Sequence, residues 1–117
     1  MEYSNILVER LDRVTRLTLN RPEKLNALSE ALMREMDDAL VSLDDDAGVS
    51  VIILRGAGRA FCAGYDITPA KDGLRNQARK NMDITGDRER LRRVVTRWFN
   101  AIWDLRTPVI AQVHGHC

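Results

Sequence analysis

Residues 51–67 read VIILRGAGRAFCAGYDI, a run of large apolar side chains followed directly by a stretch rich in glycine and alanine. The apolar run, which begins at Val49, predicts a strand buried on both faces, because it leaves no polar side. Residues 58–67 are too apolar for a solvent loop and too rich in small residues for a well-packed helix or strand. Small side chains leave the main chain accessible, so this stretch is suited to offering backbone N–H donors to a ligand.

The sequence upstream of this stretch predicts a hairpin and a helix. Residues 6–22 alternate between apolar and polar side chains, which predicts two antiparallel strands ending at a proline. Residues 29–44 repeat apolar side chains at helical spacing, and Ser29 can cap the first turn. The three aspartates at 44–46 are unfavourable at the negative end of a helix dipole, so we expect the helix to end there and the chain to turn at Gly48.

The sequence downstream predicts a polar segment, a second helix and a last strand. Residues 68–86 contain few large apolar side chains, and we expect a mobile surface segment or short helices that await a ligand. Residues 87–106 predict a helix, and residues 109–113 predict a buried strand. The order strand, strand, helix, strand, loop, helix, strand favours a mixed α/β fold with βαβ crossovers. The apolar stripe of the second helix consists of Leu91, Val94, Val95, Trp98, Phe99, Ile102 and Leu105.

The composition is that of an ordinary soluble globular protein. The chain has 117 residues, 44% of them hydrophobic and 30% charged, and its formal net charge is +1. This length corresponds to one small domain, and the charge implies no nucleic-acid partner. No apolar run approaches the roughly 20 residues that span a bilayer, so we expect no membrane association and a cytoplasmic location. Cys62 and Cys117 form no disulfide framework and suit a reducing compartment.

Three stretches together resemble the enoyl-CoA hydratase/isomerase family, the crotonase superfamily. They are LNRPEKLNAL at 19–28, VIILRGAGRAFCAGYDI at 51–67 and TPVIAQVHGHC at 107–117, in the order and at the spacing of that family. The resemblance implies a crotonase-like α/β spiral of ββα units, an acyl-CoA substrate, and assembly into trimers or dimers of trimers. Residues 1–117 would then form the N-terminal portion of a single crotonase-like domain.

The resemblance also assigns site residues. The backbone N–H of Tyr65 would be one of two donors to the thioester oxygen, with Ala63 and Gly64 leaving the approach open. Losing one such donor typically lowers the rate ~100- to 1000-fold. Lysine has an independent reason to lie near CoA, because the CoA phosphates favour a flexible cation. The resemblance places Lys24 and Leu25 along the pantetheine and phosphates, and Asp66 and Ile67 at the adenine end.

The sequence departs from the family at its end. In the family, the strand corresponding to VIAQV leads to a glycine-rich turn with the second oxyanion donor, and then to carboxylates that act as general acid and base. Neither follows before Cys117. We therefore expect a truncated piece of a longer hydratase that is inactive by itself, with no cofactor besides the CoA of the substrate.

The expected reaction is the addition of water to 2-trans-enoyl-CoA thioesters. Other reactions of this superfamily remain open, namely enoyl-CoA isomerisation and carnitinyl- or hydroxyacyl-CoA dehydration. A non-catalytic relative that binds CoA or RNA is a further alternative. The last possibility rests on the basic side chains of the second helix, although a solvated surface is their usual explanation. These side chains are Arg88, Arg90, Arg92, Arg93, Arg97 and Arg106.

Two other patterns admit sharper interpretations that we do not favour. His114, His116 and Cys117 could bind zinc with Cys62, but structural zinc sites usually combine two paired motifs, so we expect no metal. Cys62 beside His114 could act as nucleophile and base, yet nothing near it in the sequence supplies an activating cation. The aromatic residues Trp98, Phe99 and Trp103 are interpreted as core rather than as a platform for stacking bases.

Overall fold

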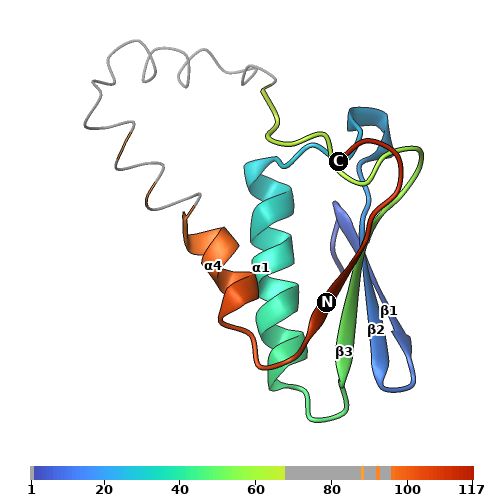
Figure 1. The fold of residues 1–117 in the computed structure, drawn as a ribbon, viewed down its shortest axis with the longest axis vertical. Helices are drawn as coiled ribbons and strands as arrows, with labels where there is room; N and C mark the ends of the chain where they lie inside the picture. The colour runs from blue at the N-terminus through green and yellow to red at the C-terminus, as the bar shows by residue number, and fades with distance from the viewer. Residues whose placement is uncertain (1, 68–87, 89–91, 93–95) are drawn as a thin grey trace.

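The computed structural model describes residues 2–67, 88, 92 and 96–117, which form a four-stranded sheet and its covering helices (Figure 1). The predicted mobile segment 68–86 and most of residues 87–95 lie outside the described residues. No helix in the described parts is long and apolar enough to cross a membrane. The elements are β1 (Ile6–Leu11), β2 (Val14–Leu19), the 3₁₀ helix η1 (Pro22–Lys24), α1 (Glu30–Asp45), β3 (Val51–Gly56), α4 (Arg97–Trp103) and β4 (Val109–Gln112).

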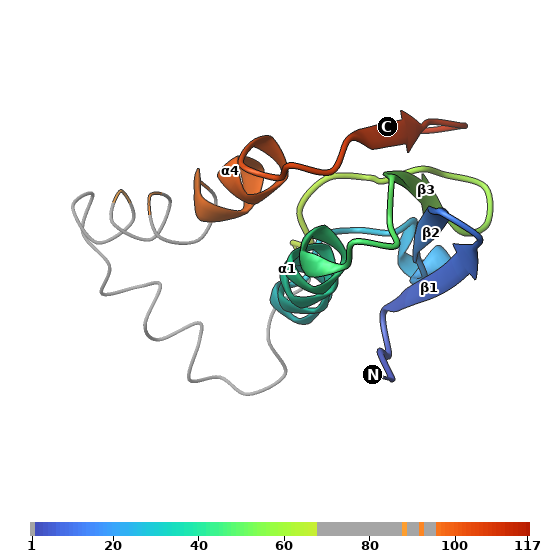
Figure 2. The same ribbon diagram turned by 90° about the horizontal axis from the view of Figure 1, so that it is seen from below.

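The strands lie in the spatial order β1-β2-β3-β4, which confirms the predicted hairpin and crossovers. Strands β1 and β2 pair antiparallel, whereas β2 with β3 and β3 with β4 pair parallel. Parallel neighbours require a crossover, and such crossovers are almost always right-handed. Two crossovers that step in the same direction put both helices on one face of the sheet, as Figure 2 shows for α1 and α4.

The core lies between α1 and the covered face of the sheet. Strand β3 alternates along its length, with Ile52 and Leu54 buried and Val51, Ile53 and Arg55 half-buried. The prediction of a strand buried on both faces was therefore wrong for the described residues, because their helices cover one face only. The largest fully buried apolar side chains are Ile6, Leu17, Leu19, Leu32, Leu40 and Ile52.

Helix α1 begins and ends close to its predicted bounds. The Ser29 hydroxyl accepts a hydrogen bond from the Leu32 N–H at 3.2 Å, which confirms the predicted N-cap. The helix ends at Asp45, and Asp46 is its C-cap. The chain then turns at residues 47–48, as expected from the unfavourable charge of the aspartates at this helix end.

The second helix and the last strand are more exposed than predicted. Trp98 packs against the core, but Phe99 is 63% exposed and Trp103 is 87% exposed, so the interpretation of these two residues as core was wrong. In β4, Val109 is half-buried and the following residues are exposed. Among the described strands β4 has a neighbour on one side only, which leaves much of it uncovered. Helix α4 ends at Trp103 rather than at residue 106.

Three loops meet where the parallel strands end, and we call residues 20–28, 57–67 and 113–117 the carboxyl-edge loops. Asn26, which is completely buried, accepts a hydrogen bond from the Arg21 N–H at 2.9 Å. Its side-chain N–H groups donate to the carbonyls of Ala57 at 2.9 Å and Ala60 at 2.8 Å, so one amide joins the first loop to the second.

The second loop is joined in turn to the third. The Phe61 N–H donates to the carbonyls of His114 and His116, both at 2.9 Å. A Cβ atom at Gly115, whose φ is +60°, would collide with the Arg59 carbonyl, so the backbones approach too closely for any other residue. The sheet thus presents a compact surface of three interlocked loops at one edge.

Replacing Asn26 by alanine should destabilise the fold by about 2–4 kcal/mol, because it leaves one buried and two partly buried backbone groups in two loops without partners. Urea denaturation measures this change. Asn20→Ala is the matched control, since the Asn20 backbone N–H bonds to the Asn5 carbonyl and survives the substitution. Equal losses of stability in the two variants would contradict the role of the Asn26 amide.

Asp44 should make stability depend on pH. It accepts a hydrogen bond from the Thr107 N–H at 2.7 Å and contacts Arg106, which hold the pKa of its carboxyl below the ordinary value. A lowered folded-state pKa stabilises the fold above the unfolded pKa near ~4, and this stabilisation is lost as pH falls through the folded pKa. We expect Asp44→Asn to be less stable than wild type at neutral pH, with the gap closing in acid.

Thermal unfolding at a series of pH values measures this gap. Ser50→Ala is the control. Ser50 lies near the same end of the sheet, and its side chain does not titrate. A gap between wild type and Asp44→Asn that stayed constant down to strongly acidic pH would refute the electrostatic account.

Candidate functional site

The predicted site residues gather on two of the carboxyl-edge loops. Lys24 and Leu25 lie on the loop after β2, and residues 63–67 lie on the loop after β3. The Ala63 N–H donates to the Leu25 carbonyl at 3.0 Å, and the Leu28 N–H donates to the Gly64 carbonyl at 2.7 Å. Two stretches far apart in the sequence are therefore fixed side by side by their main chains.

The backbone N–H of Tyr65 faces away from this pairing. Leu28 and Tyr65 form a parallel bridge, which uses the Gly64 carbonyl and the Asp66 N–H, the latter donating to the Leu28 carbonyl at 3.0 Å. Within the described part of the chain, the Tyr65 N–H has no acceptor. Its direction is set by the bonds on either side of it, so it is a preorganised donor.

The surroundings of this donor are open. Gly64 has a φ of +89°, and a Cβ atom there would meet no heavy atom within 4 Å. The Gly64 N–H donates to the Cys62 sulfur at 3.4 Å, which ties the turn on its other side. Tyr65 is 44% exposed, and its partial burial raises the pKa of its hydroxyl. The main chain at Gly64 is therefore approached through open space, without a side chain of its own.

Asp66 forms an ion pair that the sequence did not reveal. Its carboxylate lies 2.9 Å from the Arg21 guanidinium, and the two side chains are only 14% and 16% exposed. Arg21 also donates to the Ala27 carbonyl at 2.6 Å, so the pair braces both loops. The adenine contacts that the resemblance implies for Asp66 and for Ile67, which is 86% exposed, stay predictions.

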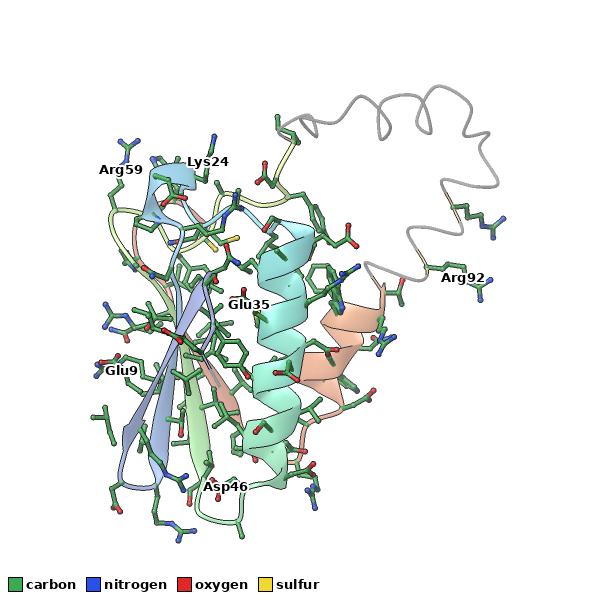
Figure 3. The ribbon with its side chains drawn as sticks, turned by 180° about the vertical axis from the view of Figure 1, so that it is seen from behind. Glu9, Lys24, Glu35, Asp46, Arg59 and Arg92 are labelled. Carbon is green, nitrogen blue, oxygen red and sulfur yellow. The ribbon has the colours of Figure 1, made fainter. Side chains whose placement is uncertain are left out.

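Two exposed cationic side chains lie on the carboxyl-edge loops. Figure 3 shows Lys24 and Arg59 directed outward at the edge opposite Asp46, and both side chains are exposed. Sequence reasoning missed Arg59, although a lone cation within an otherwise small and apolar loop was an available signal. It also missed the buried amide of Asn26, which lies in the quoted stretch 19–28.

The other interpretations find little support in this geometry. His114 bonds through its ring Nε2 to the Gly58 carbonyl at 2.8 Å, and within the described residues no three His, Cys, Asp or Glu side chains gather as metal ligands. Arg106 bonds to Asp44 and Asp45 at the opposite edge of the sheet, away from the loops. Among the described residues, hollows of about 290 and 250 Å³ lie beside the end of α1 and between α1 and β1, away from the carboxyl-edge loops.

Known proteins resemble this chain closely. Residues 9–117 match the family model of the enoyl-CoA hydratase/isomerase family. The chain is 40% identical over 120 residues to a probable enoyl-CoA hydratase of Mycobacterium bovis, covering 99% of this chain and 40% of that protein. It is 42% identical over 107 residues to the peroxisomal Δ(3,5)-Δ(2,4)-dienoyl-CoA isomerase of Arabidopsis thaliana, covering 89% and 38%.

Solved structures share the fold. The crystal structure of an enoyl-CoA hydratase from Mycobacterium smegmatis superposes with a TM-score of 0.82 at 32% identity, covering 97% of this chain and 41% of that one. The chain thus spans about two fifths of the length of the relatives it matches. With its mixed α/β architecture of crotonase type, the chain belongs to the enoyl-CoA hydratase/isomerase family.

Proposed function

We propose that this chain forms the acyl-CoA-binding part of an enoyl-CoA hydratase, which adds water to 2-trans-enoyl-CoA thioesters. The observation that supports this proposal best is the Tyr65 N–H, held in place by the flanking bonds and without an acceptor among the described residues. Relatives named as enoyl-CoA hydratases support the choice of reaction.

The Tyr65 N–H would act on the oxygen of the thioester. When a water oxygen attacks C3 of the enoyl group, electrons move through C2 to the thioester oxygen and an enolate forms. A fixed donor at about 3 Å stabilises that charge without reorganising, and one such donor is worth ~100- to 1000-fold in rate. The resemblance assigns the general acid and base to carboxylates outside residues 1–117, and it implies a trimer or hexamer. The sequence composition is the basis for proposing a cytoplasmic location.

Isomerisation is the second candidate, because the chain is 42% identical to a dienoyl-CoA isomerase over 107 residues. Both reactions need the same polarised thioester, and they differ in the groups that move protons. Turnover by a longer protein that also carries the acid and base separates them: a hydratase removes the absorbance of a conjugated 2-enoyl thioester, whereas an isomerase acts on a 3,5-dienoyl thioester. Product from neither substrate, with full binding of both, would leave a non-catalytic CoA-binding protein.

Gly64→Val should weaken binding of crotonyl-CoA by tenfold or more, because a β-branched side chain would occupy the open space beside the Tyr65 N–H. The positive φ at this position adds a strain of about 1–2 kcal/mol, so circular dichroism must show that the variant is folded. Calorimetric titration measures the affinity. Ala47→Val, an exposed change at the opposite edge of the sheet, is the matched control.

Wild-type affinity in folded Gly64→Val protein would refute this site. Equal weakening in Ala47→Val would instead show that the loss does not come from the loop surface.

Lys24→Ala and Arg59→Ala should each weaken binding of acyl-CoA by about two- to fivefold, the range for an exposed charge pair. Acyl-pantetheine, which lacks the nucleotide phosphates, should bind both variants like wild type. Raising the salt concentration should shrink the differences seen with acyl-CoA. Arg13→Ala is the control, because this exposed cation lies in the hairpin turn at the far edge and bonds to Ser50.

Equal effects of the Lys24 and Arg59 substitutions on acyl-CoA and acyl-pantetheine would exclude a phosphate contact. RNA that competes with acyl-CoA, with an affinity that falls steeply as the salt concentration rises, would favour the alternative of a nucleic-acid partner.

A further inference from the structure

Cys62 and Cys117 lie on neighbouring segments of the carboxyl-edge loops. The Cys62 N–H donates to the His116 carbonyl at 3.2 Å, and that carbonyl carbon is bonded directly to the nitrogen of Cys117. Standard peptide dimensions then keep the two cysteine nitrogens within about 5.5 Å of each other. In a trans peptide the Cα atom of Cys117 lies about 2.8 Å from the His116 carbonyl oxygen, and the Cα atom of Cys62 lies about 4 Å from it, so the two Cα atoms are at most about 7 Å apart. A disulfide needs Cα atoms roughly 4.4–6.8 Å apart, which this bound allows.

Both thiols are free and neither is fully buried. Cys62 is half-buried, and Cys117 is exposed. Further pairing of the two segments, with Ala60 bridged to both Gly115 and His116, holds them in this register. The Cys62 sulfur also accepts the Gly64 N–H at 3.4 Å, so it contacts the turn that directs the Tyr65 N–H.

We propose that Cys62 and Cys117 form a reversible disulfide when the protein meets a peroxide, and that this bond weakens the binding of acyl-CoA. The second half of the proposal rests on the function proposed above. The thiolate of exposed Cys117 attacks the peroxide O–O bond and becomes a sulfenic acid, releasing hydroxide. The Cys62 thiol then attacks that sulfur, the S–S bond forms, and the oxygen leaves as water, so two thiols are oxidised and one peroxide is reduced.

The disulfide would act through the Gly64 N–H. Rotating the Cys62 sulfur towards Cys117 takes it away from that donor, which loses the acceptor that fixes the turn before Tyr65. A loosened turn no longer preorganises the Tyr65 N–H. We expect the oxidised protein to bind crotonyl-CoA about tenfold more weakly than the reduced protein, the scale of one lost hydrogen bond.

Mass spectrometry tests the bond itself. Dilute reduced protein is treated with one equivalent of hydrogen peroxide, and we expect a mass loss of about 2 Da, a linked peptide pair containing both cysteines, and full reversal by dithiothreitol. Cys62→Ser and Cys117→Ser should give no internal link. Wild-type protein that yields only sulfinic acid or dimers linked between chains would overturn the proposal.

Calorimetry with crotonyl-CoA tests the consequence, using reduced and oxidised protein side by side. The affinity of Cys117→Ser should be the same before and after peroxide. A disulfide that forms without changing the wild-type affinity would overturn the control of binding. Reduced protein that binds no crotonyl-CoA would refute the proposed function instead, and the mass measurement would still decide whether the thiols pair.

Discussion

The buried amide of Asn26 is the contact on which the site depends. Its oxygen and nitrogen bond to three backbone groups, one in its own loop and two in the loop after β3. A buried backbone group without a partner costs more free energy than one hydrogen bond contributes. Loss of the Asn26 amide would remove the partners of all three backbone groups at once. The loop after β3, which Asn26 joins to the loop after β2, is in turn bonded to the segment after β4, and it also carries the Tyr65 N–H, whose direction is set by the bonds to Leu28.

Periodicity predicted the elements, and the resemblance predicted the site residues, which lie on the loops after β2 and β3. The alternation of apolar and polar side chains predicted the hairpin, and the order of the elements predicted the crossovers. The helical spacing of apolar side chains, with Ser29 as N-cap, predicted the bounds of α1 to within one residue. Asn26 and the ion pair between Arg21 and Asp66 could not be found this way. Whether a polar side chain is buried depends on contacts with residues more than thirty positions away, which no local pattern contains.

The errors concern which face is covered. The apolar character of β3, β4 and the aromatic residues of α4 was plain in the sequence, but apolar character does not say where the helices lie. Both helices lie on one face of the sheet, so alternate positions of β3 are half-buried. Phe99 and Trp103 are exposed on α4. A correct assignment needs the handedness of the connections as well as the pattern.

The interlocking of the three loops has a kinetic consequence. Each loop follows a different parallel strand, and the bonds between them join residues far apart in the sequence, such as Phe61 and His116. Contacts of this kind form late, because the chain must first close long loops against conformational entropy. The surface made by all three loops can therefore be completed only after β4 has paired, and its appearance during refolding would report that late step.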